Sequence, residues 1–163
     1  MTVLTGRQGE AMRPSSLAPS RGLLLLLPLV ALVPQACRNP AELRWAVRPG
    51  TIVYNQQVGS MVILPTQVVA GQAAPVTVYT FGNGCVAPAY TNTTVSGAIA
   101  IVEPFDSVVV QLPPHMTCTD ELNAFPHSVS VVFPQAGAGR ILIIGWNHVT
   151  ETDDTLDYNL TVQ

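Results

Sequence analysis

Val-Thr-Val-Tyr-Thr-Phe, residues 76–81, carries the alternation that decides the fold class. Val76, Val78 and Thr80 share one face of an extended strand, because successive side chains point to opposite faces. Ser-Val-Ser-Val-Val-Phe, residues 128–133, follows the same rule and places two valines and Phe133 opposite two serines. This period of two predicts strands that bury one face and leave the other in water.

The remainder of the chain repeats such apolar stretches between turn residues at roughly 8–12-residue spacing, a rhythm typical of an antiparallel sandwich or barrel. Ile-Leu-Ile-Ile, residues 141–144, is apolar on both faces and is the best candidate for a central strand. Only residues 118–125 can hold a helical turn. The expected strands are 51–54, 61–64, 76–81, 93–96, 98–103, 108–112, 128–133, 140–145 and 157–162.

Chain length and net charge narrow the possible domain organisation and the possible partners. A chain of 163 residues supports one core of ordinary size. From Arg38 onward there are four arginines and nine acids, hence a net charge of −5. Because binding to phosphates needs a basic face, nucleic acid is excluded as an expected partner.

The N-terminal part has the order of an export signal. Arginines occur within residues 1–21, an apolar run follows over 22–33, and the small Ala36 comes next. A membrane-spanning helix needs roughly 18 or more apolar residues, and Pro28 interrupts this shorter run. We therefore predict export, with a signal peptide over residues 1–36, a tether over 37–50 and the folded domain over 51–163. Translation can begin at Met1 or at Met12, since residues 12–36 already form a complete leader.

Cys37 follows this leader directly. Ala36-Cys37 resembles the end of a bacterial lipobox, in which the cysteine becomes a lipidated N-terminus that attaches the protein to the membrane. Pro34 and Gln35 depart from the pattern, which prefers Leu and a small residue there. The expected outcome is lipidation of Cys37, and the alternatives are secretion without a lipid or a leader that is retained.

The other two cysteines are Cys85 and Cys118. Export to an oxidising compartment makes a disulfide between them the expected state. The alternative is a metal-binding or catalytic thiol, although neither cysteine has a second Cys or a His at zinc-finger spacing. His115, three residues before Cys118, lacks the downstream His and Met of a blue-copper loop.

Three stretches together resemble a set of uncharacterised exported bacterial proteins, some of them lipid-anchored. They are residues 68–78 leading into Thr-Phe-Gly-Asn-Gly-Cys (80–85), Pro-Phe-Asp (104–106), and residues 118–119 with 125–145. The resemblance covers roughly residues 60–146 and rests mainly on the placement of the two cysteines. It implies an all-β fold, an immunoglobulin-like antiparallel β-sandwich of about seven to nine short strands with a linking disulfide. It implies no particular activity.

Enzyme signatures are absent from the sequence: it contains no Gly-x-Ser-x-Gly elbow, His-Glu-x-x-His helix, phosphate-binding loop or dinucleotide fingerprint. A catalytic or metal site would have to use His115, His127 or His148, and a surface or hydrogen-bonded histidine is the commoner role for each. His127 is the most interesting of them, because Asp106, Asp120 and Glu121 are candidates to approach it. The acidic stretch over residues 151–157 lacks the spacing and glycine of a calcium loop, and we expect a solvated turn there.

The sequence therefore predicts a non-enzymatic envelope protein without a cofactor, acting as a binding or structural module. Expected partners are another envelope protein or a surface glycan. The contact regions would be residues 81–90 and 115–127, which the disulfide would make neighbours. An alternative from another class is a periplasmic copper- or zinc-binding protein that uses His115, His127 and nearby acids.

Overall fold

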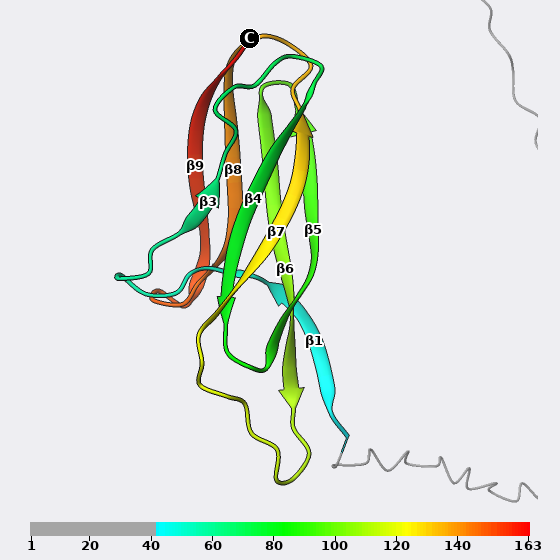
Figure 1. The fold of residues 1–163 in the computed structure, drawn as a ribbon, viewed down its shortest axis with the longest axis vertical. Coiled ribbons are helices and arrows are strands. Elements are labelled where there is room, and N and C mark those ends of the chain that lie inside the picture. The colour runs from blue at the N-terminus through cyan, green and yellow to red at the C-terminus, as the bar shows by residue number, and fades with distance from the viewer. Residues whose placement is uncertain (1–41) are drawn as a thin grey trace, which may run out of the picture. The chain divides into compact units, whose positions relative to one another are not determined.

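The computed structural model describes residues 42–163, and in this range the chain is folded into β-strands joined by turns and loops, with no helix (Figure 1). The described strands are β1 (Arg44–Pro49), β2 (Thr51–Val53), β3 (Met61–Ile63), β4 (Ala73–Gly82), β5 (Val86–Ser96), β6 (Ile99–Gln111), β7 (Asn123–Val132), β8 (Gly137–Asn147) and β9 (Thr152–Val162).

The strands form two sheets, as an all-β sandwich requires. The larger sheet contains β5, β6, β8 and β9 as its long strands, with β1 and β2 added beside β6 and β8. The smaller sheet has the order β3-β4-β7. Most pairs are antiparallel, but β6 pairs with β8 and β2 pairs with β8 in parallel, so the expected purely antiparallel arrangement is corrected.

The period-two patterns are confirmed by burial. Val76, Val78 and Thr80 of β4 are all fully buried, and Val131 and Phe133 line the same interior from the end of β7. Ile141 and Ile143 of β8 face them from the larger sheet. β8 has neighbours on both sides, which confirms the central position expected from its continuous apolar sequence. The core is therefore formed by β-branched and aromatic side chains from both sheets.

Gly50 connects β1, which pairs with β6, to β2, which pairs with β8. The parallel strands β6 and β8 pair only over Ile99–Val102, and β1 then pairs with the rest of β6 while β2 pairs with the end of β8. The Gly50 N–H donates to the carbonyl of Pro104 at 2.8 Å, and its carbonyl accepts from the Trp146 N–H at 2.9 Å. A Cβ on Gly145 would lie 2.7 Å from that same carbonyl, so this crossing requires glycine on both strands.

Two strands expected over residues 98–103 and 108–112 are one continuous strand, β6. The two expected strands were separated by residues 104–107, and this gap begins with Pro104, which has no N–H for a sheet ladder. Pro104 lies between the segment that pairs with β8, ending at Val102, and the segment that pairs with β1, beginning at Phe105. The missing N–H therefore falls between two partners, and the strand passes through the proline.

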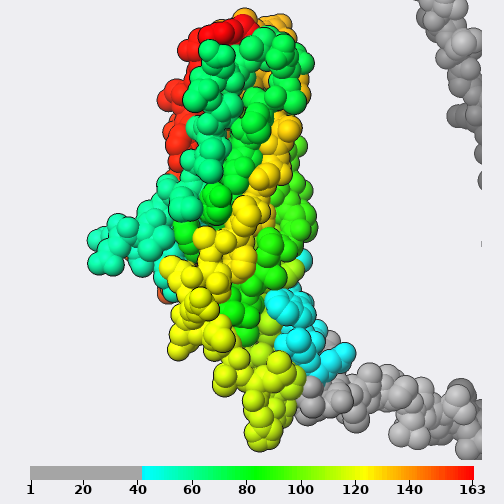
Figure 2. Space-filling view, in the orientation of Figure 1, coloured from blue at the N-terminus to red at the C-terminus, as the bar shows by residue number. Residues whose placement is uncertain are grey.

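The expected helical turn within residues 118–125 is wrong. Asn123 already belongs to β7, and residues 123–125 pair with residues 80–82 of β4. Their backbone groups are used in this ladder, which excludes a helical hydrogen-bonding pattern. The loop between β6 and β7 instead forms the lower end of the described body (Figure 2). Several strands are also longer than the short strands expected, and β6 reaches 13 residues.

Residues 44–49, within the range assigned to a tether, are paired in the larger sheet as β1. The predicted signal peptide over residues 1–36 and Cys37 lie outside the described residues. Within residues 42–163 there is no helix long and apolar enough to cross a membrane.

Candidate functional site

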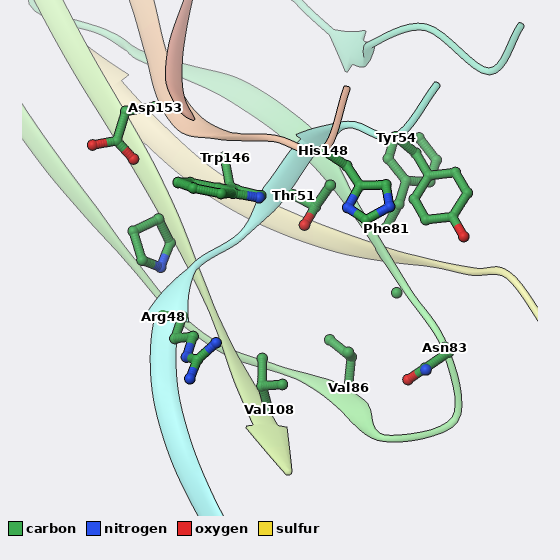
Figure 3. A pocket seen from close by; sticks show the side chains of 12 residues that line it. Arg48, Thr51, Tyr54, Phe81, Asn83, Val86, Val108, Trp146, His148 and Asp153 are labelled. Atoms are coloured by element: carbon green, nitrogen blue, oxygen red, sulfur yellow. The ribbon is translucent and has the colours of Figure 1, made fainter. Parts of the chain in front are cut away.

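A pocket of about 570 Å³ lies where β1 and β2 join β6 and β8 of the larger sheet. In Figure 3, the aromatic side chains Trp146, His148 and Tyr54 lie along one side. Arg48, Val108, Val86 and Asn83 lie along the other side. A volume of this size falls in the range of small-molecule sites, about 300–1,000 Å³.

The aromatic side is positioned by the parallel pairing of β2 with β8. Thr51 is the register partner of Trp146, and the His148 N–H donates to the Val53 carbonyl at 2.9 Å. This pairing brings Tyr54, just after β2, against His148, just after β8. Their rings stack with centroids 5.2 Å apart and planes 10° from parallel. Two segments nearly a hundred residues apart in sequence thus form one aromatic surface.

Arg48 and Asn83 bring hydrogen-bonding groups to the opposite side. Arg48 is exposed at the end of β1, and its side chain makes no ion pair or hydrogen bond within residues 42–163. Asn83 is in the turn between β4 and β5, where its Oδ1 accepts from the Cys85 N–H at 2.9 Å. The side-chain carbonyl of Asn83 therefore holds the turn, and its amide NH₂ has no hydrogen-bond partner in the described part of the chain.

The Cys85–Cys118 disulfide is confirmed and lies beside this turn. It joins the β4–β5 turn to the loop between β6 and β7, with the two Cα atoms 5.2 Å apart. The Gly84 N–H also donates to the Thr119 carbonyl at 3.2 Å. The two predicted contact regions are therefore neighbours, and the disulfide supports the side of the pocket that contains Asn83.

His127 is buried at the centre of a polar network. Its Nε2 lies 3.0 Å from Asp106 Oδ1 and 3.1 Å from Thr80 Oγ1, and its Nδ1 lies 3.0 Å from Thr91 Oγ1. The side chains of His127 and Asp106 are each only 3% exposed. Because a carboxylate only accepts hydrogen bonds, we assign the proton to Nε2, which leaves Nδ1 to accept from the Thr91 hydroxyl.

An order of acid, histidine and hydroxyl is also found in nucleophilic triads, where the hydroxyl faces a substrate site. Neither Thr91 nor His127 lines the pocket. The four residues instead come from β6, β7, β4 and β5, so the network links the two sheets. We assign it a structural role.

This network forms a layer between the apolar core and the pocket. Along the inner face of β4, Thr80 precedes Gly82, and along the inner face of β6, Asp106 precedes Val108. Gly82 and Val108 both line the pocket. The buried polar side chains therefore lie directly next to the pocket residues Gly82 and Val108 and support them from the core side.

The predicted approach of acids to His127 is confirmed for Asp106 alone. Asp120 and Glu121 are exposed in the loop before β7, and so is His115, which has a left-handed backbone with φ of 74°. Within residues 42–163, no group of three or more His, Cys, Asp or Glu side chains is arranged to hold a metal ion.

The acidic stretch over residues 151–157 is mostly strand rather than a turn, because β9 begins at Thr152. Asp153 lines the pocket, and Asp154 accepts from the Asn147 amide at 2.8 Å. Asp157 forms an exposed ion pair with Arg140. The hydrogen bond from this guanidinium lowers the pKa of Asp157, and the same bond raises the pKa of Arg140.

Most of the pocket was not predicted from the sequence. His148 was considered as a site residue, but Arg48, Tyr54 and Asp153 were given no role. These residues lie at strand ends that are distant in sequence, and they meet because Gly50 carries the chain from β6 to β8. The available signal was the pair of aromatic residues at 146 and 148, directly after a continuous apolar strand.

Comparisons with protein family models, curated proteins and solved structures found no match for this chain. The description of the candidate site therefore rests on the geometry of this chain alone.

Proposed function

We propose that this protein is an exported, non-enzymatic binding module of the bacterial cell envelope, with an immunoglobulin-like sandwich as its scaffold. The pocket between Arg48 and Trp146 holds the ligand. The observation that carries the proposal is the composition of this pocket, in which aromatic rings, half-buried at Trp146 and Tyr54 and exposed at His148, face a cation with no ion pair within residues 42–163. Apolar surface with a few placed polar groups is the usual make-up of a binding site.

Two features support export. The N-terminal sequence has the order of a signal peptide. The Cys85–Cys118 disulfide is compatible with an oxidising compartment. We further propose that Cys37 is lipidated after cleavage and attaches the module to the membrane. Labelling cells with a radioactive fatty acid tests this anchor: the protein should be labelled, and the Cys37→Ser variant should not. Equal labelling of the two proteins would eliminate the anchor.

The binding function is tested by cosedimentation with envelope fragments of the producing bacterium. The exported protein should carry Cys37→Ser, so that a lipid anchor cannot itself cause sedimentation. Tyr54→Ala removes one ring of the aromatic surface and should weaken the apparent Kd by up to about tenfold, because an aromatic contact contributes up to about 1.5 kcal/mol beyond its buried area.

Tyr90→Ala is the matched control. Tyr90 is 51% exposed and stacks on Phe105 with centroids 4.9 Å apart, but it does not line the pocket. The control should sediment like the parent protein. Equal sedimentation of the Tyr54→Ala variant and the parent would refute a role for the pocket.

A further inference from the structure

We infer that the ligand of this pocket is a neutral saccharide, recognised through a sugar ring with neighbouring hydroxyl groups. This inference rests on the proposed binding function and names the chemical class of its ligand.

The aromatic side of the pocket matches the apolar side of a sugar. A pyranose ring has faces of C–H groups and a rim of hydroxyls, so it can pack flat on an aromatic ring while its rim stays polar. Trp146 and the stacked pair of His148 and Tyr54 lie along the same side of the pocket, with Thr51 between them (Figure 3). Because Tyr54 and His148 are already stacked, these two rings are held in place before a ligand arrives. Such preorganisation lowers the entropic cost of binding.

The polar groups match the hydroxyl rim. Each hydroxyl both donates and accepts. Arg48 and the Asn83 amide supply donors, and the Asp153 carboxylate supplies an acceptor. Neither the Arg48 side chain nor the Asp153 side chain makes an ion pair or hydrogen bond within residues 42–163. Asp153 lies beyond Trp146 from Arg48 and Asn83 (Figure 3), so different hydroxyls of one saccharide can meet the donors and the acceptor.

The charge balance favours a neutral ring over an acidic one. One arginine and one aspartate line the pocket, so their formal charges cancel. A ligand carboxylate or phosphate that pairs with Arg48 would also meet the repulsion of Asp153. A neutral hydroxyl-rich ligand uses both groups without that repulsion. The net charge of −5 from Arg38 onward adds to the bias against anions.

The test begins with an array of neutral and acidic glycans, probed with the full exported protein. Glycans that bind are then titrated against a Trp45→Phe variant while tryptophan fluorescence is recorded. The chain has two tryptophans, and Trp45 lies outside the pocket, so this variant leaves Trp146 as the reporter. We expect neutral glycans to bind and to change the Trp146 emission with saturation.

Two substitutions test the named contacts. Arg48→Ala and Asp153→Asn should each weaken glycan binding about tenfold or more, because a hydrogen bond to a charged group contributes about 1.5–3 kcal/mol. Arg44→Ala is the control, since Arg44 is an exposed arginine of the same strand that does not line the pocket. Both pocket residues are exposed, so these variants should fold, which circular dichroism verifies.

Binding confined to acidic glycans, or to no glycan on the array, would overturn the inference. So would neutral-glycan binding that Arg48→Ala and Asp153→Asn leave unchanged. If envelope sedimentation still depended on Tyr54 in any of these cases, the binding function would stand and its ligand would belong to another class, such as an envelope protein. If sedimentation did not depend on Tyr54, the binding function would fail as well.

Discussion

Arg48 and Asp106 lie directly opposite each other on β1 and β6 and face the same side of the sheet, yet they form no ion pair. The Asp106 carboxylate is bonded to His127 at 3.0 Å instead. Asp106 is buried, and its second oxygen, Oδ2, has no hydrogen-bond partner among residues 42–163. This arrangement leaves the Arg48 side chain available at the pocket. The buried Asp106 carboxylate then depends on the hydrogen bond from His127.

Replacing His127 with alanine should therefore destabilise the protein strongly. The change leaves the buried Asp106 carboxylate without the hydrogen bond that His127 donates, and leaving a buried charged group unsatisfied costs about 3 kcal/mol or more. The free energy of unfolding, measured by urea denaturation at pH 7, checks the expectation.

His115→Asn serves as the control for this experiment. His115 is exposed and has a positive φ, which asparagine also tolerates. Its unfolding free energy should stay within about 0.5 kcal/mol of the parent value. A His127→Ala variant as stable as this control would show that the buried network contributes little to folding.

Removing the Cys85–Cys118 disulfide should lower the free energy of unfolding. It should also loosen the side of the pocket that contains Asn83. The bridge closes a loop of 33 residues, and the chain-entropy model gives about 3.7 kcal/mol as the upper limit of its contribution. The double variant Cys85→Ala and Cys118→Ala should unfold at a lower urea concentration than the oxidised parent. Reduced parent protein is the control, and it should match the double variant. A parent whose intact mass shows two free thiols would invalidate this prediction.

The fold class was predictable because it depends on local alternation. Val76, Val78 and Val131 are buried in the structure because they occupy every second position of a strand. The disulfide was predictable once export was assumed, since two cysteines remained after Cys37. These features need no knowledge of which strand lies beside which.

The pocket and the parallel pairs were not predictable in the same way. They depend on the connection at Gly50 and on the close approach of Gly145, which are contacts between distant segments. The expected gap over residues 104–107 was also wrong, because the cost of the missing N–H of Pro104 depends on which neighbouring strand needs that group. The hydrogen bond between Asp106 and His127 was anticipated as one of three possible contacts, and only the packing of the two sheets selected it.

The ion pair of Asp157 with Arg140 predicts a dependence of stability on pH. A carboxyl whose pKa is lowered by folding adds stability above its ordinary pKa, about 3.9, and this stability is lost as the pH falls through the lower folded value. The difference in unfolding free energy between the parent and Asp157→Asn should thus be constant from pH 7 to about pH 5 and shrink below that. Added salt should also reduce it, because both groups are exposed. A difference that grew on acidification would contradict this assignment.

Gly50→Ala tests the crossing that creates the pocket. A Cβ at this position would lie 2.9 Å from Asp106 Oδ2 and would overlap the Thr80 Cγ2 methyl group. Overpacking of this kind typically costs about 1–3 kcal/mol, and urea denaturation should detect the loss. Adding Thr80→Ser removes the overlapping methyl group but keeps the hydroxyl that contacts His127, so the double variant should recover part of the lost stability. The two changes should therefore be non-additive, as expected for groups in direct contact. Additive effects, or a Gly50→Ala variant as stable as the parent, would mean that the chain does not cross so closely at this glycine.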